Sequence, residues 1–157
     1  MDIKNVYGKG NNMTNEYLLK VNVEVDTKES EEVVLKKNFL QIAVTTLHQN
    51  FKFDFKGIQT SDECITFNYF YNETDWIFKD ERTFNFFYPL DVDNADFVAM
   101  YKNEPKRTNI EKNHLYIFPY WMTHKFISPT KDFKQVILQG GLDTIDRPIL
   151  KQINKRW

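Results

Sequence analysis

The stretch ITFNYFY at positions 65–71 alternates bulky Ile65, Phe67 and Tyr69 with Thr66 and Asn68. This period of two is typical of a β-strand with one buried face. Similar short aromatic segments, separated by turn signals, recur at residues 51–55, 76–78, 83–88, 97–101, 114–118, 123–128 and 135–139. About eight such strands predict a mainly β protein, specifically a jelly roll (double-stranded β-helix) or a related two-sheet barrel.

Two elements are expected ahead of this aromatic region. Residues 17–25 alternate apolar and polar side chains, with Leu18 on the polar side, which predicts the first strand. From residue 30, apolar residues recur every four positions, and acidic residues at 29–32 suit a helix N-terminus, so we expect one amphipathic helix at about residues 30–49. The helix residues expected to pack on the sheet are Val34, Leu35, Phe39, Ile42 and Leu47.

The composition is typical of one ordered domain that has neither a disulfide bond nor a metal site made of cysteine thiolates. The chain has 157 residues, of which 16% are aromatic, and only five are glycine and five are proline. Its single cysteine, Cys64, excludes an intramolecular disulfide and is expected in the core. A formal charge of -1 gives no long-range attraction to nucleic acid or to an anionic membrane. The basic residues after Tyr101, including Lys106 and Arg107, stand in a loop with nearby acidic ones, and the mixed signs favour solvent or a partner contact over DNA.

The two ends of the chain differ from its centre. We expect an extended arm at residues 1–15, the jelly-roll domain at 16–141 and a C-terminal extension at 142–157, because both ends are polar and carry few strand signals. Neither a signal peptide nor a membrane span is visible, so a virion or cytoplasmic location is expected. Ordering these ends needs contacts with neighbours. The expected interface residues are Tyr7, Ile149, Ile153 and Trp157.

A resemblance appears in the C-terminal half. The segment HLYIFPYWMTHKF at positions 114–126, followed by KQVIL at 134–138, resembles small 2-oxoglutarate/Fe(II) oxygenases. Residues 65–71 and the segment WIFKDER at 76–82 look like the same family's aromatic strand and hairpin, so the matches cover about half of the chain. The resemblance implies a double-stranded β-helix preceded by a helix. It also implies that His124 binds iron and that Lys134 pairs the 2-oxoglutarate carboxylate.

The family's His-x-Asp/Glu motif is missing. Iron in such sites needs two histidines and a carboxylate, but neither His48, His114 nor His124 is followed at that spacing by an acid. Lys134 also stands where the family usually has arginine, so the bidentate fork is lost. We therefore expect no iron and no other cofactor, with His124 a rim histidine bonded to a backbone carbonyl and His114 a cross-strand partner.

An iron site built from His48 with Asp54 or Asp62 stays open as an alternative, and would make the protein an Fe(II)/2-oxoglutarate-dependent hydroxylase with a non-sequential triad.

Consecutive Phe86 and Phe87 must face opposite sides of a strand, and one of those sides needs either a second sheet or a partner.

The expected function is a non-catalytic structural or interaction module. A chain rich in Lys, Asn, Ile, Phe and Asp is typical of an AT-rich genome such as that of a phage. We expect a virion component, at a neck, tail or capsid position, present as several copies. Its partners would be copies of itself and other structural proteins, contacted through both termini, with no nucleic acid and no membrane. A third possibility is a carbohydrate- or small-molecule-binding jelly roll that uses exposed aromatic side chains.

Overall fold

The computed structural model describes residues 12–15, 18–24, 41–42, 45, 58–69, 72–78, 83–130 and 135–144. This part of the chain is mainly β, as the sequence predicts, and every strand pair is antiparallel. The strands are β1 (Asn12–Asn15), β2 (Leu18–Asn22), β3 (Ile58–Tyr69), β4 (Asn72–Glu73), β5 (Phe84–Asp91), β6 (Asp96–Tyr101), β7 (Glu104–Asn109), β8 (His114–Pro119), β9 (His124–Ser128) and β10 (Gln135–Thr144).

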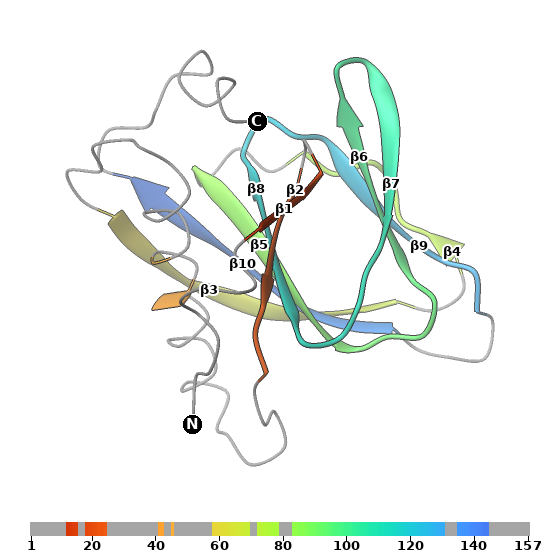
Figure 1. Ribbon diagram of the computed structural model, residues 1–157, viewed down its shortest axis with the longest axis horizontal. Helices are drawn as coiled ribbons and strands as arrows, with labels where there is room; N and C mark the ends of the chain where they lie inside the picture. The colour runs from red at the N-terminus through yellow and green to blue at the C-terminus, as the bar shows by residue number, and fades with distance from the viewer. Residues whose placement is uncertain are drawn as a thin grey trace.

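The strands form two sheets (Figure 1). A six-stranded sheet has the order β1-β2-β8-β5-β10-β3, and a four-stranded sheet has the order β4-β9-β6-β7. From β3 to β10 the pairing is nested, because β3 pairs with β10, β4 with β9, β5 with β8, and β6 with β7. The chain therefore runs as one long hairpin whose tip is the β6–β7 turn and whose two arms are divided between the sheets.

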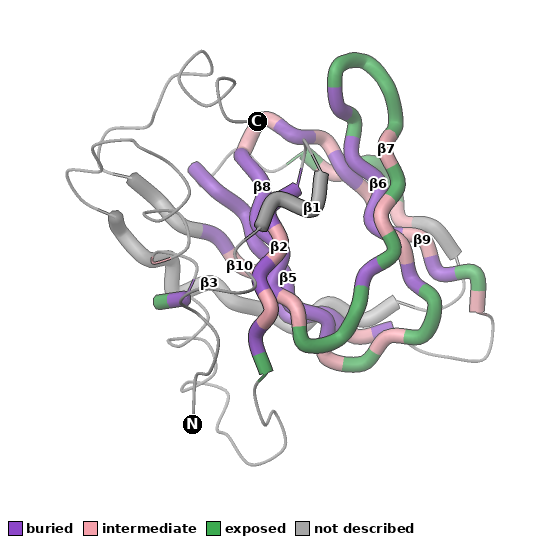
Figure 2. Tube along the Cα trace, viewed as in Figure 1, coloured by how far each residue is buried: buried purple, intermediate pink, exposed green. Residues whose placement is uncertain are grey.

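An aromatic core lies between the two sheets. Phe87 of β5 and Tyr116 of β8 stack with ring centroids 4.9 Å apart, and Phe126 of β9 meets Phe87 edge-on at 5.2 Å. Phe97 of β6 closes the same cluster at 5.1 Å from Phe87. Offset and edge-to-face pairs of this kind add to the free energy gained by burying the rings. Figure 2 shows the buried positions concentrated on the middle strands β5 and β8.

The six-stranded sheet is also buried on its other face. Phe86 and Phe87 point to opposite sides, yet each is only 1% exposed. Phe87 belongs to the core between the sheets, whereas Phe86 lies in a row with Leu19 and Ile117, which are fully buried. Both sides of β5 are thus covered within the chain. Leu18 is a correction to the sequence reading, because it is fully buried in the core between the sheets instead of lying on an exposed side of β2.

Strands include residues of both the predicted arm and the predicted C-terminal extension. Asn12 pairs with Lys20 and Met13 with Leu19, so the last four residues of the predicted arm belong to the six-stranded sheet. Polar residues can do this because edge pairing satisfies backbone groups whatever the side chains are. β10 continues to Thr144, beyond the predicted boundary at residue 141. Tyr7, Ile149, Ile153 and Trp157 lie outside the described residues.

Only a small part of the predicted helix is described. Gln41, Ile42 and Thr45 have helical backbone, and the Gln41 side-chain amide donates to the Thr45 hydroxyl at 3.4 Å, one turn further on. Ile42 is 1% exposed. Val34, Leu35, Phe39 and Leu47 lie outside the described residues, so a helix spanning residues 30–49 stays a prediction. Among the described residues, no helix has the length and apolar character needed to cross a membrane.

Candidate functional site

His124, the residue that the resemblance assigns to iron, opens β9 and faces the interior. It is only 1% exposed, so it is not the rim histidine that the sequence suggests. The expected bond to a backbone carbonyl is present, since Nδ1 lies 3.2 Å from the carbonyl oxygen of Met122. Backbone pairing with Ile77 on one side and Ala99 on the other fixes the strand, and alternation then turns the imidazole inward.

Aromatic rings surround the imidazole of His124. Phe118 meets it edge-on at 4.7 Å between ring centroids, Phe97 stacks at 5.5 Å, and Phe126 lies at 6.0 Å. Within the described part of the chain, no three His, Cys, Asp or Glu side chains lie close enough together to hold a metal ion. An iron triad needs a second histidine and a carboxylate beside the first. The ring neighbours of His124 are consistent with packing, and its role as an iron ligand stays a prediction.

The other residues of the predicted iron site cannot be compared with the position of His124. His48, Asp54 and Lys134 lie outside the described residues, and of Asp62 only the backbone, in β3, is described. Their roles in an iron and 2-oxoglutarate site stay predictions.

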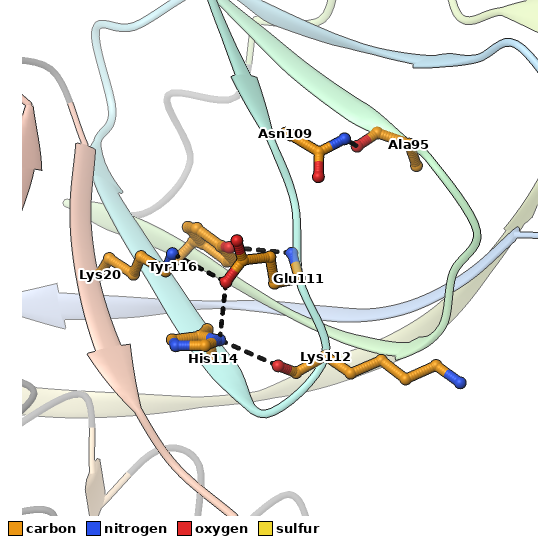
Figure 3. Close-up of polar contacts among 7 residues, drawn as sticks. All are labelled: Lys20, Ala95, Asn109, Glu111, Lys112, His114 and Tyr116. Atoms are coloured by element: carbon orange, nitrogen blue, oxygen red, sulfur yellow. Dashed lines mark hydrogen bonds and ion pairs between the residues drawn. The ribbon is translucent and has the colours of Figure 1, made fainter.

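His114 opens β8 and pairs across the sheet with Asn22, which confirms it as a cross-strand residue. Its Nδ1 lies 2.9 Å from the Lys112 carbonyl oxygen and 3.7 Å from a carboxylate oxygen of Glu111 (Figure 3). The same Glu111 carboxylate lies 3.2 Å from the Lys20 ammonium. These contacts tie β2 and β8 to the β7–β8 turn and account for His114 as a turn-holding residue.

Tyr116 lies directly beneath this turn. Its hydroxyl accepts a hydrogen bond from the Glu111 backbone N–H at 3.0 Å (Figure 3). Burial raises the pKa of the Tyr116 phenol well above its ordinary value, because the charged phenolate would lose its hydration. The group is therefore a neutral hydrogen-bond acceptor and part of the core.

Exposed apolar side chains gather on the outer face of the four-stranded sheet. Phe78 is 56% exposed, Trp76 is 42% exposed and Met100 is 36% exposed, and these are the exposed large hydrophobic residues of the described part of the chain. Ile77 is bridged to the inward-facing His124, so Trp76 and Phe78 on either side of it face outward.

The strand register places further residues on this face. Val98 of β6 is opposite Lys125 of β9, and the Met100 N–H donates to the Thr123 carbonyl at 2.8 Å. These outward positions alternate with the inward residues Ala99 and His124. We call the resulting surface the aromatic face, made of Trp76, Phe78, Val98, Met100, Thr123 and Lys125.

The charged groups on and beside the aromatic face have partners within the described chain. The Lys125 ammonium lies 4.4 Å from the centroid of the Trp76 ring, a cation–π contact that fixes the indole. Next to it, the Arg107 guanidinium of β7 pairs with the Asp96 carboxylate of β6, which also accepts from the Asn109 amide at 3.0 Å. The aromatic face can therefore offer a ligand a flat aromatic surface with little net charge, in which the Trp76 indole is already restrained.

The sequence reading did not single out this surface. Residues 76–78 carry a detectable signal, because Trp76 and Phe78 flank Ile77 at the spacing of one strand face. Their exposure depends on how far the outer side of the four-stranded sheet is covered, which is a property of the assembled fold, and Val98 on the same side is only 5% exposed. No protein-family description matches this chain, and no curated protein matches its sequence. The assignment of a function rests on the chain's own residues.

Proposed function

We propose that strands β3 to β10 form a jelly roll. The supporting observation is the strand order, β3-β10-β5-β8 in one sheet and β4-β9-β6-β7 in the other, with β1 and β2 added beyond β8. A long hairpin that folds over itself produces this interleaved order, and it gives the two Greek keys of an eight-stranded jelly roll. The double-stranded β-helix implied by the sequence resemblance has the same architecture.

We further propose that the protein is a non-catalytic interaction module, a structural component of a phage virion present in several copies. The observation that carries the interaction role is the aromatic face, where the exposed large hydrophobic residues of the described chain lie together. The rings packed around His124 support a structural interior. The composition supports the phage origin, and the polar ends with apolar Ile149, Ile153 and Trp157 support assembly through the termini.

The assembly is tested by the mass of the protein in solution. Light scattering of the full chain is expected to show several copies, because the ends then bind neighbouring subunits. A chain ending at Thr144 keeps all of β10 and is expected to stay folded by circular dichroism but to be monomeric. Trp157→Ala should weaken the assembly, whereas Lys155→Ala, a change at a charged residue in the same segment, should not. A monomeric full chain, or a truncated chain that still assembles, would remove this part of the proposal.

The alternative function is an Fe(II)/2-oxoglutarate-dependent hydroxylase. One observation favours it, since His124 opens β9 and points between the two sheets of the proposed jelly roll. In that case His124 would hold the iron and Lys134 would pair a carboxylate of 2-oxoglutarate. The ring packing at 4.7 and 5.5 Å from His124 stands against it, because those neighbours offer no ligand atoms.

A further inference from the structure

We propose that the aromatic face binds a carbohydrate chain, with Trp76 and Phe78 as the stacking platform. The proposal deepens the interaction role and rests on it, but not on the assembly through the termini. The platform comes from local geometry. Trp76 and Phe78 are two residues apart on one side of an extended segment, which spaces them about 7 Å along the chain. Ile77 between them is paired to β9 by backbone hydrogen bonds of 2.7 and 2.9 Å, so both rings stand on a fixed backbone.

The chemistry of a sugar matches such a platform. A pyranose ring has one face rich in C–H groups, whose partial positive charge is attracted to the negative face of an aromatic ring. Its hydroxyl groups lie around the edge and need polar neighbours. Thr123 lies in the strand register between Phe78 and Met100, and the Lys125 ammonium lies beside the Trp76 ring, so partners for sugar hydroxyl groups border the apolar surface.

The charge on this surface favours a neutral ligand. Lys125 is the only charged residue of the aromatic face as defined above, and the neighbouring Arg107 is already paired with Asp96. Single-stranded nucleic acid also stacks on aromatic rings, but it requires a groove with a clear excess of positive charge along the backbone. A neutral sugar chain needs no such excess.

The size of the apolar surface favours a small ligand over a second copy of the chain. A fully covered Phe or Trp buries roughly 150–250 Å². With exposed fractions of 42% for Trp76 and 56% for Phe78, about 200 Å² of the surface of these two residues is available for contact. A stable protein interface buries roughly 800 Å² on each partner. Two or three sugar rings would cover the platform, whereas a subunit would need much more surface than the rings provide.

The cation–π contact prepares Trp76 for binding. The Lys125 ammonium at 4.4 Å restrains the indole before any ligand arrives. An aromatic side chain that is already held loses less conformational freedom on binding, so more of the contact energy appears as affinity. Lys125 is therefore a positioning residue, and Trp76 and Phe78 are the contact residues.

The test is a titration of the full chain, labelled with ¹⁵N, with cellohexaose, maltohexaose and chitohexaose. At least one of these probes is expected to shift the Trp76 indole N–H resonance in a saturable manner. Trp76→Ala and Phe78→Ala should each weaken that binding tenfold or more, while Trp76→Phe, which keeps a ring, should weaken it less. Lys125→Met should reduce the affinity several-fold. Glu104→Ala, at the exposed start of β7, is the matched control and should change nothing.

Three outcomes would overturn the proposal. The first is that none of the probes shifts Trp76 up to its solubility limit. The second is that binding occurs but survives in both alanine variants, with each variant shown to be folded by circular dichroism. The third is that neither the unchanged protein nor any variant binds a sugar, while Trp76→Ala abolishes self-association. This result would make the aromatic face a contact between copies of the chain. The first outcome leaves the terminal assembly untouched, so the two proposals fail separately.

Discussion

At the scale of single residues, Gln135 shows how one buried side chain can substitute for strand pairing. Its amide oxygen accepts from the Asp93 N–H at 2.7 Å, and its amide nitrogen donates to the Asp93 carbonyl at 3.0 Å and to the Ser128 hydroxyl at 3.1 Å. Gln135 is fully buried, and these bonds use both of its N–H groups. The β5–β6 turn, where Asn94 has φ of 53°, is thereby tied to β9 and β10.

Replacing Gln135 with leucine should therefore be costly. The change leaves the Asp93 backbone groups and the Ser128 hydroxyl without their buried partner, so we expect the free energy of unfolding to fall by about 2–4 kcal/mol. Thr130→Val is the control, because Thr130 donates to the same Asp93 carbonyl at 3.3 Å from an exposed position. Urea denaturation measures both variants. Equal losses in the two variants would show that the Gln135 network contributes little.

Tyr116 makes stability sensitive to alkaline pH. Burial raises the pKa of its phenol in the folded state, so the folded protein holds this proton more tightly than the unfolded chain does. The stabilisation is complete below the unfolded pKa of about 10 and is lost as the pH rises from there through the raised folded pKa. Unfolding free energies measured across this alkaline range should fall less steeply in Tyr116→Phe. An identical slope in the two proteins would contradict the assignment to Tyr116.

At the scale of elements, the β6–β7 hairpin combines a strained turn with a protected edge. Lys102 and Asn103 have φ of 51° and 63°, the left-handed geometry that matches the twist of a two-residue hairpin. β7 is an edge strand in the four-stranded sheet, and Pro105, Lys106 and Arg107 discourage pairing with another chain. The free edge of β7 is therefore a poor site for assembly.

The turn can be tested by changing Asn103 alone. Asn103→Ala should lower the free energy of unfolding by about 1–2 kcal/mol, because a β-carbon without a compensating side-chain bond is unfavourable at positive φ. Asn103→Gly should be close to neutral or slightly stabilising, since glycine accepts that geometry. Thermal unfolding of the pair checks the turn. If the alanine variant were as stable as the glycine variant, the positive φ would not be a constraint in solution.

The sequence predicts strands that have a buried face better than it predicts edge strands or the neighbours of a given side chain. The aromatic alternation at residues 83–88, 97–101 and 114–118 predicts strands that the structure places as β5, β6 and β8. β7 was expected as a loop, because EPKRTN has no apolar alternation and an edge strand needs only backbone partners. The burial of His124 was also missed, since it depends on Phe97 and Phe118 from strands distant in sequence.

At the scale of the whole molecule, aromatic side chains pack the core between the two sheets of the described chain. The rings of Phe87, Phe97 and Phe126 occupy the space between the sheets, and His124 is packed among them. His124→Phe should accordingly keep the fold because the ring packing is preserved, but should lower the melting temperature modestly because the Met122 carbonyl loses its buried partner. A large loss of stability in this variant would mean that the imidazole has a polar role beyond its bond to the Met122 carbonyl.

We propose as the central claim that the protein works by surface binding and not by iron chemistry. Its most direct test is an anaerobic titration of the full chain with Fe(II) in the presence of 2-oxoglutarate, followed by calorimetry. We predict no stoichiometric binding, and no difference between the unchanged protein, His124→Phe and the surface control His114→Ala. Binding of one Fe(II) per chain that is lost in His124→Phe and kept in His114→Ala would contradict the account.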